Sequence, residues 1–208
     1  MARDTDFHYD TLSNRGGFVW FYTMDLARWG ELKARPSMIW IEPPGTPSVG
    51  LVLLEAFRAT GDESYLQRAK EVAGALAAAQ HPSGGWNYYA DFDPDGLAEY
   101  QANFFSRCWG WQEYLKPRDN ATFDDYSTTE SVRFLLRLHA AGAVEHDGTL
   151  RRGLDFILQA QYPDGGWPQR FPLDEHADYS AARTFNDQVI HDCILVLLEA
   201  HATLGDPA

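Results

Sequence analysis

Two short acidic turns, 62 positions apart in the chain, each place two oxygen-bearing side chains next to one another. Asp124 and Asp125 form the first pair, and Asn186 and Asp187 form the second. Adjacent carboxylates repel each other unless a positive charge lies between them. A cation or an arginine is therefore expected there, and carboxylate and amide oxygens are ligands that a hard cation such as Ca²⁺ prefers.

Glu42 occupies the same slot in an earlier part of the chain. When the sequence is laid against itself without gaps, Glu42 falls on Asp124 and on Asn186. Each of these residues precedes the first helix of a predicted hairpin, so three loops could deliver oxygens to one point. We therefore predict a Ca²⁺ site. Its ligands would be Glu42, Asp124, Asp125, Asn186 and Asp187.

An ordinary helix cap is the alternative role for these residues. Asp and Asn often precede a helix, where they accept backbone hydrogen bonds and favour the helix dipole. For Asp124 taken alone, the cap is the more common role. One residue is enough to cap a helix, however, and the doubled oxygens in each turn favour a cation.

Arginine side chains gather near these turns although the chain carries a formal net charge of −13. They are Arg107, Arg118, Arg170 and Arg183. A guanidinium presents a planar fork that fits the carboxylate of a uronate sugar. Arg183 stands three residues before Asn186 and so near the predicted metal. A surface ion pair with a local acid such as Asp178 is the alternative for Arg183.

Composition and charge limit the classes of protein that this chain can be. With 208 residues, 45% of them hydrophobic, the chain can bury one sizeable core, and 1–208 is predicted to be a single domain. The acidic balance argues against nucleic acid, because a phosphate backbone requires a cationic surface. It permits an acidic polysaccharide if divalent cations bridge the carboxylates. No apolar run approaches the length of a membrane span.

Zinc and thiol chemistry find no support in the sequence. The histidines lack an HExxH spacing and form no cluster with cysteine. Cys108 and Cys193 have neither metal nor redox spacing, and we expect two buried thiols. The chain also lacks the Gly-x-Ser-x-Gly elbow of the α/β-hydrolases and a P-loop.

A seven-residue pattern, Gln-x-Pro-x-Gly-Gly-Trp, occurs twice and ends in Trp86 and in Trp167. In both places it follows a predicted helix. We expect Gln80 and Gln161 to bond backbone groups there and both indoles to pack against the next hairpin. Since aromatics make up 14% of the chain, some should also contact flat sugar faces. The candidates are Trp86, Trp167 and Tyr179.

The periodicity of apolar residues predicts an all-α protein. Helices are expected at 46–60, 64–79, 127–141, 150–160 and 188–203, with an irregular arm at 1–20 and a loop-rich insertion at 91–120. For the first helix, Thr46 is the expected N-cap and Gly61 the stop. Hairpins that repeat every 60 to 80 residues fit an α/α toroid. The toroid is expected to be incomplete, with about two and a half hairpins, because the third lacks its second helix.

Three stretches resemble the pectic acid lyase family, which is polysaccharide lyase family 10. They are QYPDGGWPQRFP, YSAARTFND and ATFDDYSTTESVRFL. The resemblance covers 45–208 and is most specific in GGWPQ and TFND. A shorter Gln-x-x-x-Gly-x-Trp element also occurs in terpene cyclases and prenyltransferases, but the aspartate-rich motif and the zinc ligands of those enzymes are not found in the sequence.

The N-terminal part leaves two locations open. The segments SNRGGFVW and WIEPPGT look like a secreted bacterial subgroup of this family. That likeness implies a secreted or periplasmic protein whose leader has been removed. The first residues, MARDTDFHYD, themselves lack the apolar core of a secretion signal, which leaves a cytosolic location as the alternative.

What the resemblance implies is Ca²⁺-dependent β-elimination of polygalacturonate, with an arginine as Brønsted base. The family's calcium-binding and catalytic aspartates correspond to Asp124 and to Asn186-Asp187, and Asp125 stands where the family usually has asparagine. The family's base arginine lies downstream of TFND, past the last residue of this sequence. Either this fragment is inactive alone, or Arg183 or Arg170 substitutes.

Two other interpretations remain open at this point. The first is a carbohydrate-binding or scaffold module without catalysis on the same toroid. The second is a glycoside hydrolase or an epimerase, for which Asp124 and Asp187 could supply an acid and a base. The identity of the uronate, the position of cleavage and the oligomeric state do not follow from the sequence.

Overall fold

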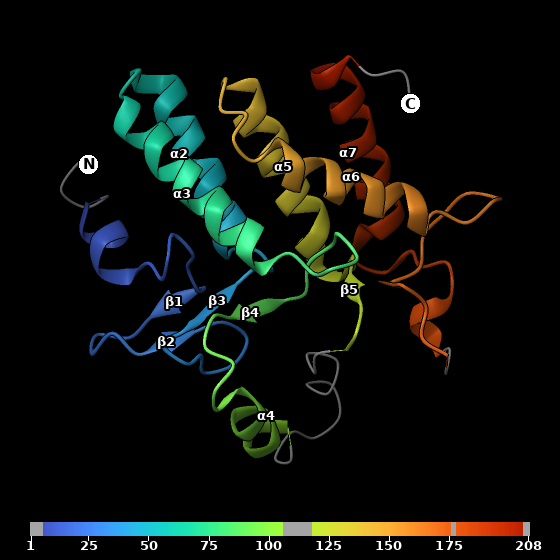
Figure 1. The fold of residues 1–208 in the computed structure, drawn as a ribbon, viewed down its shortest axis with the longest axis horizontal. Coiled ribbons are helices and arrows are strands. Elements are labelled where there is room, and N and C mark those ends of the chain that lie inside the picture. The colour runs from blue at the N-terminus through green and yellow to red at the C-terminus, as the bar shows by residue number, and fades with distance from the viewer. Residues whose placement is uncertain (1–5, 106–117, 176–177, 206–208) are drawn as a thin grey trace.

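Helices dominate the fold, and they stand side by side in pairs (Figure 1). The computed structural model describes residues 6–105, 118–175 and 178–205. The helices of the repeats are α2 (Thr46–Thr60), α3 (Glu63–Ala79), α5 (Ser127–Ala140), α6 (Asp147–Ala160) and α7 (Val189–Leu204). The prediction of an all-α protein is thereby confirmed. Within the described ranges, no helix is long and apolar enough to cross a bilayer.

The repeat is visible in the packing of these helices. α2 packs on α3, α5 packs on α6, and the three first helices α2, α5 and α7 form a row in which α5 contacts both neighbours. This is the arrangement expected for hairpins that follow one another around an axis. Loops at one end of the row carry the acidic turns.

Short strands tie the loops at that end together. The antiparallel pairs are β1 (Phe21–Tyr22) with β2 (Arg28–Trp29), β3 (Met38–Trp40) with β4 (Tyr89–Asp91), and β5 (Ala121–Thr122) with β6 (Arg170–Phe171). β3 and β4 join the segment before Glu42 to the segment after the first Gly-Gly-Trp pattern, and β5 and β6 join the segment before Asp124 to the segment after the second. In β5 and β6, for example, Thr122 lies opposite Arg170.

The helix boundaries follow the local signals in most places. α2 ends where Gly61 adopts a left-handed conformation with φ of 70° and its N–H donates to Phe57 O. α3 begins after Asp62, whose carboxylate accepts from Ser64 N. The predicted cap Thr46 is wrong: Gly45 precedes the helix, and the Thr46 hydroxyl exchanges hydrogen bonds with the backbone of Phe18 instead.

The structure differs from the predicted elements in three further places. α6 starts three residues before the predicted 150, at Asp147. The insertion 91–120 is not all loop, because α4 (Leu97–Phe105) lies within it. The arm contains a short π-helix, His8–Leu12, and Tyr9 and Leu12 of that helix are buried.

Both Gly-Gly-Trp patterns close their hairpins in the same way. The indole N–H of Trp86 donates to Leu76 O at 2.8 Å, and that of Trp167 donates to Ile157 O at 2.7 Å. Both tryptophans are almost completely buried. The predicted packing role is confirmed, and the suggestion that these two indoles contact a sugar is wrong, because no face of either ring reaches the surface.

The glutamines of the two patterns differ. The Gln80 amide donates to Gly84 O and Thr149 O, so it joins the first repeat to the second. Its oxygen accepts from Arg152 Nε at 2.9 Å. Gln161 is exposed. The predicted role of the glutamine therefore holds for the first pattern.

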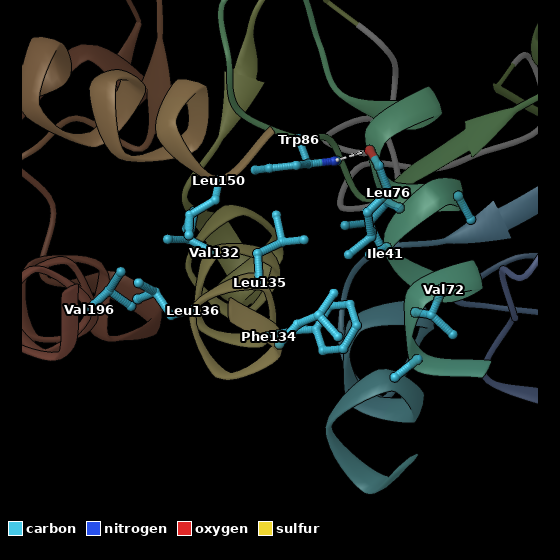
Figure 2. Close-up of a cluster of buried hydrophobic side chains, with 14 of the residues drawn as sticks. Ile41, Val72, Leu76, Trp86, Val132, Phe134, Leu135, Leu136, Leu150 and Val196 are labelled. Atoms are coloured by element: carbon cyan, nitrogen blue, oxygen red, sulfur yellow. Dashed lines mark hydrogen bonds between the residues drawn. The ribbon is translucent and has the colours of Figure 1, made fainter. Parts of the chain in front are cut away.

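The core lies between the hairpins, as Figure 2 shows for the cluster around Trp86, Val132 and Leu135. Phe134 projects from α5 toward α2. A Cβ atom at Gly50 would stand 2.5 Å from the Phe134 ring. α2 and α5 can approach this closely only because position 50 has no side chain. Cys193 also lies in this core as a free thiol, as predicted, whereas Cys108 lies outside the described residues.

The outward face of α7 is apolar and exposed. Val132 and Leu136 on α5 are completely buried, whereas Ile194 and Leu198, which follow them by 62 positions on α7, are 46% and 60% exposed. The same repeat positions therefore carry apolar side chains in both helices, and packing covers them in α5 alone.

Replacement of Trp86 by phenylalanine tests the closure of the hairpin. We expect a loss of about 2 kcal/mol in the free energy of unfolding, because the change removes part of a buried ring and leaves Leu76 O without its donor. Urea unfolding followed by circular dichroism measures it. Phe185→Leu, at a site that is 83% exposed, is the control and should change stability by less than about 0.5 kcal/mol. An equally small effect of Trp86→Phe would contradict this closure.

Candidate active site

Three carboxylates meet at the N-terminal ends of α5 and α7. Asp124, Asp125 and Asp187 each offer an oxygen, and these oxygens lie within 4.8 Å of one another. Asp124 and Asp125 belong to a 3₁₀ turn, Asp124–Tyr126, and Asp187 to a second one, Asn186–Gln188. The two turns contact each other, and α7 contacts the first of them. The predicted convergence of these two loops is confirmed.

The buried tryptophans determine where the two turns lie. Trp86 O accepts from Thr122 N, and Trp167 O accepts from Thr184 N, at 2.9 and 3.0 Å. Two residues later the backbone N–H groups of Asp124 and Asn186 donate to these same threonine hydroxyls. Each acidic turn is thus attached to the Gly-Gly-Trp loop of the preceding hairpin.

The acidic residues do not cap the helices that follow them. The residues at the cap positions are Tyr126 for α5 and Gln188 for α7, and neither helix has a side-chain cap bond. The Gln188 amide instead donates to the Tyr126 hydroxyl at 2.6 Å, which links the two turns. The helix-cap alternative for Asp124 is therefore wrong.

The backbone of both turns is strained in the same way. Asp125 and Tyr126 have φ of 46° and 60°, and Asp187 and Gln188 have φ of 45° and 58°. Each such residue costs on the order of 1–3 kcal/mol and persists where the surrounding structure imposes it, which is common at ligand sites. The two left-handed residues bend the chain just before each helix.

Asp124 is the buried member of the cluster. One of its two carboxylate oxygens, Oδ2, accepts a hydrogen bond from the Tyr88 hydroxyl at 2.7 Å. Oδ1 is shielded from solvent and has no hydrogen-bond partner within the described part of the chain. A buried carboxylate oxygen without a donor is costly. An all-oxygen site with an unpaired buried carboxylate oxygen fits a hard cation such as Ca²⁺.

Repulsion and burial raise the pKa values of the neighbouring acids. Burial, and then the Asp124 and Asp187 carboxylates, raise the pKa of Asp125 to about 7. Burial, and then Asp124 within hydrogen-bonding reach, raise the pKa of Asp187 to about 6. A bound cation would favour the ionised form of both groups and oppose these shifts.

Two predicted ligands lie at the margin of the cluster. Glu42 is buried and accepts from Trp40 Nε1 at 3.2 Å, and the structure does not place it among the three converging acids. The charge of the cluster still acts on Glu42, since burial and then the Asp125 carboxylate raise the pKa of Glu42 to about 8. Asn186 is exposed, and its amide donates to Asp187 Oδ2.

The two arginines predicted as catalytic are both engaged. Arg170 is 5% exposed. It donates from Nε to Asn120 Oδ1 at 2.8 Å and from Nη2 to Asn87 Oδ1 at 2.5 Å. Burial lowers the pKa of the Arg170 guanidinium. The placement of Arg170 as a group that reaches substrate is therefore wrong.

Arg183 forms an ion pair on the surface. Its Nη2 donates to both oxygens of Asp164 at 2.6 and 2.7 Å, and its guanidinium lies 4.7 Å from the centre of the Tyr162 ring. The predicted alternative of a local ion pair is thus right in kind, but the partner is Asp164 and not Asp178. Asp178 pairs with Arg118 at 3.2 Å.

The remaining predicted substrate contacts divide by exposure. Arg118 keeps a third of its side chain exposed while it pairs with Asp178 and, at 3.7 Å, with Asp174. Tyr179 is 70% exposed and can present its ring to a ligand. Arg107 lies outside the described residues.

Sequence reasoning missed three residues that support the site. Tyr88 bonds Asp124, and Asn87 and Asn120 bond Arg170. The signal that could have found two of them is their position, since Asn87 and Tyr88 directly follow the first Gly-Gly-Trp pattern, in the loop that contacts the acidic turn.

Comparison with known proteins gives the family and the fold of the chain. The family model described as pectic acid lyase matches residues 98–207, which is just over half of the chain. A solved family 10 polysaccharide lyase from Cellvibrio cellulosa is similar, with a TM-score of 0.55, 17% identity and 97% of this chain covered. A mutant of such a lyase from the same organism, in complex with trigalacturonic acid, has a TM-score of 0.57 at 17% identity over 95% of this chain.

Those two structures are larger than the present chain, which covers 61% of each. At this identity they show a shared fold. The family assignment comes from the match to 98–207, which contains both acidic turns and the second Gly-Gly-Trp pattern. The chain belongs to the pectic acid lyase family.

Proposed function

We propose that this chain carries the cation site of a polysaccharide lyase that cleaves polygalacturonate or a related uronate polymer by Ca²⁺-assisted β-elimination. The observation that carries the proposal is the meeting of Asp124, Asp125 and Asp187 within 4.8 Å, with one buried oxygen of Asp124 unpaired within the described part of the chain. Family membership and the trigalacturonate complex of the related lyase support this substrate class. A secreted or periplasmic location follows as part of the proposal.

In this proposal Asp124, Asp125 and Asp187 would hold the ion, with Glu42 and Asn186 next to them. Bound Ca²⁺ would withdraw charge from the uronate carboxylate and make the proton on C5 more acidic. A base would take that proton as the bond from C4 to the glycosidic oxygen breaks. This forms a double bond between C4 and C5 at the new uronate end, and the departing oxygen would take up a proton from solvent. Arg118 and Tyr179, which are partly or largely exposed, would bind neighbouring sugars.

Neither arginine near the cluster is assigned to proton removal. Arg183 is held by Asp164 in a surface ion pair, and its planar guanidinium suits the binding of a substrate carboxylate. Arg170 is buried and bonded to amides. This observation favours a second candidate function, in which the chain binds uronate polymer without turnover.

A glycoside hydrolase fits the geometry less well. The acids of an inverting hydrolase stand about 6.5–9.5 Å apart, and those of a retaining one about 5–5.5 Å. The oxygens of Asp124 and Asp187 lie within 4.8 Å, and Asp124 is buried. Product mass separates the reactions, since hydrolysis adds water and elimination does not.

Activity toward polygalacturonate in the presence of Ca²⁺ tests the lyase proposal. We expect new ultraviolet absorbance from unsaturated uronate ends, and we expect a chelator to abolish it. Turnover that a chelator leaves unchanged would contradict a role for the cation. Binding of trigalacturonate without any turnover would favour the second candidate function.

Asp124→Asn and Asp187→Asn test the ligand assignment directly. Each change removes one negative charge from an oxygen donor, so the affinity for Ca²⁺ should fall at least about tenfold. Isothermal titration calorimetry measures it in the absence of substrate. Asp155→Asn, at an exposed site on α6, is the matched control and should bind Ca²⁺ like the wild type. Unchanged affinity in both site variants would remove the basis for this cation site.

The raised pKa values predict how the stability of the metal-free protein depends on pH. Asp125 and Glu42 have ordinary pKa values of 3.8 and 4.5, and about 7 and 8 in the folded chain. Between these values the folded state binds more protons than the unfolded state, so the free energy of unfolding falls as the pH rises. The stabilising contribution is complete below about pH 4 and lost by about pH 8.

Urea unfolding in the presence of a chelator, at a series of pH values, measures this loss. Asp125→Asn should show a smaller loss between about pH 4 and pH 8, because it removes one titrating group and its repulsion of Glu42. Added Ca²⁺ should also reduce the loss in the wild type. An identical pH dependence in Asp125→Asn and the wild type would show that this carboxyl is not held in the repulsive cluster.

A further inference from the structure

We propose that Tyr88 and Arg170 are positioning residues of the cation site, which set the orientation of Asp124 without touching cation or substrate. This inference rests on the proposed function, because it concerns the same site. It assigns to Arg170 a role different from the catalytic one predicted from the sequence. It also assigns a role to Tyr88, which sequence analysis did not single out.

The two oxygens of Asp124 have different surroundings. The Tyr88 hydroxyl donates to Oδ2 at 2.7 Å. Oδ1 is buried and has no partner among the residues that the structure describes. With one oxygen held by a neutral donor, the carboxylate cannot rotate freely, and the other oxygen remains available as a ligand.

Tyr88 is buried and is held in place by Arg170. It is 3% exposed and directly precedes β4. The Arg170 guanidinium lies 5.7 Å from the centre of the Tyr88 ring, on which it can make a cation–π contact. Arg170 also donates to the side chain of Asn87, the neighbour of Tyr88 in the chain. One side chain therefore contacts both the Tyr88 ring and the side chain of the residue before it.

Arg170 and Asn87 also bond Asn120, which lies just before the acidic turn of Asp124. Arg170 Nε donates to Asn120 Oδ1, and Asn87 Nδ2 donates to Asn120 O at 2.9 Å. Asn120 directly precedes β5, which leads to Asp124. One buried guanidinium thus binds the segment that carries Tyr88 and the segment that carries Asp124, and so keeps donor and acceptor in register.

The partners of Arg170 also matter for charge. Within the described residues, the hydrogen bonds of Arg170 to Asn120 and Asn87 go to neutral amides, and it forms no ion pair with Asp124. An arginine that paired with Asp124 would compete with a cation for that carboxylate. By bonding amides, Arg170 supports the site and leaves the acidic oxygens for an ion.

The repeat shows that this support is special to Asp124. In the second Gly-Gly-Trp pattern, Gln169 stands where Tyr88 stands in the first, and Asn186 stands where Asp124 does. Asn186 is exposed and bonds Asp187, whereas Asp124 is buried. The tyrosine therefore accompanies the one position of the two at which a buried carboxylate has to be oriented.

Calcium titration of Tyr88→Phe tests the inference, because this change removes the hydroxyl and keeps the ring. We expect the affinity of the folded, substrate-free protein for Ca²⁺ to fall about 10–100-fold, as for other residues that orient a metal ligand. Isothermal titration calorimetry gives the affinity, and circular dichroism shows that the variant is folded. Tyr22→Phe, which loses a hydroxyl bond to Leu12 O and not to an acid of the cluster, is the matched control and should keep the wild-type affinity.

A double-mutant cycle distinguishes positioning from a general loss of structure. If Tyr88 acts through Asp124, Tyr88→Phe should change the affinity no further once Asp124→Asn is present. Arg170→Lys is the second variant, since it keeps the charge but cannot bond both asparagines, and it should lower the affinity in the same direction.

These measurements distinguish a failure of the positioning role from a failure of the calcium site. If the wild type binds Ca²⁺, and both Tyr88→Phe and Arg170→Lys bind it equally well, the positioning role is overturned and the calcium site remains. Additive effects of Tyr88→Phe and Asp124→Asn would also overturn it, because the hydroxyl would then act elsewhere. If the wild type does not bind Ca²⁺, the calcium site of the proposed function fails, and the positioning role fails with it.

Discussion

Carboxylates that lie within a few ångströms of each other in a partly buried site have to be held there by the rest of the fold, because their mutual repulsion and their desolvation both oppose the arrangement. In this protein two buried tryptophans hold the acidic turns in place. Each closes its hairpin through an indole hydrogen bond, and its carbonyl then fixes the threonine that precedes an acidic turn. The site is in this sense a product of the core.

The repeats share a framework but have diverged at the positions that face the site. The two acidic turns have nearly the same backbone, including two consecutive left-handed residues in each. Yet Asp124 is buried and bonded to Tyr88, whereas its counterpart Asn186 is exposed. The first repeat places Glu42 in the same slot, where it is buried beside the cluster but outside the group of converging oxygens. A repeated backbone thus carries different side chains, in different surroundings, at equivalent positions.

The arginines show how charge is managed around such a site. The chain is strongly acidic, but the three described arginines near the cluster do not pair with its aspartates. Arg170 bonds amides, Arg183 pairs with Asp164, and Arg118 pairs with Asp178. These three arginines therefore do not neutralise the negative charge of the cluster.

Much of this could be predicted from local sequence. The helices follow from apolar periodicity and from stop signals such as Gly61, and the toroid and the two acidic turns follow from the repeat, since equal positions in successive hairpins must face the same rim. That Asp124 and Asp187 meet could be predicted for this reason. The family resemblance was likewise visible in short motifs.

Only the tertiary structure decided which side chains take part and in what role. Tyr88, Asn87 and Asn120 reach Asp124 and Arg170 through strand pairs between distant segments, which leave no local periodicity to detect. The burial of Trp86 and Arg170 excluded surface roles that their chemistry alone would allow. Sequence determined the repeated backbone because helix and turn signals act over a few residues, whereas burial and hydrogen-bond partners depend on contacts between repeats, and these contacts made one aspartate the buried centre of the site.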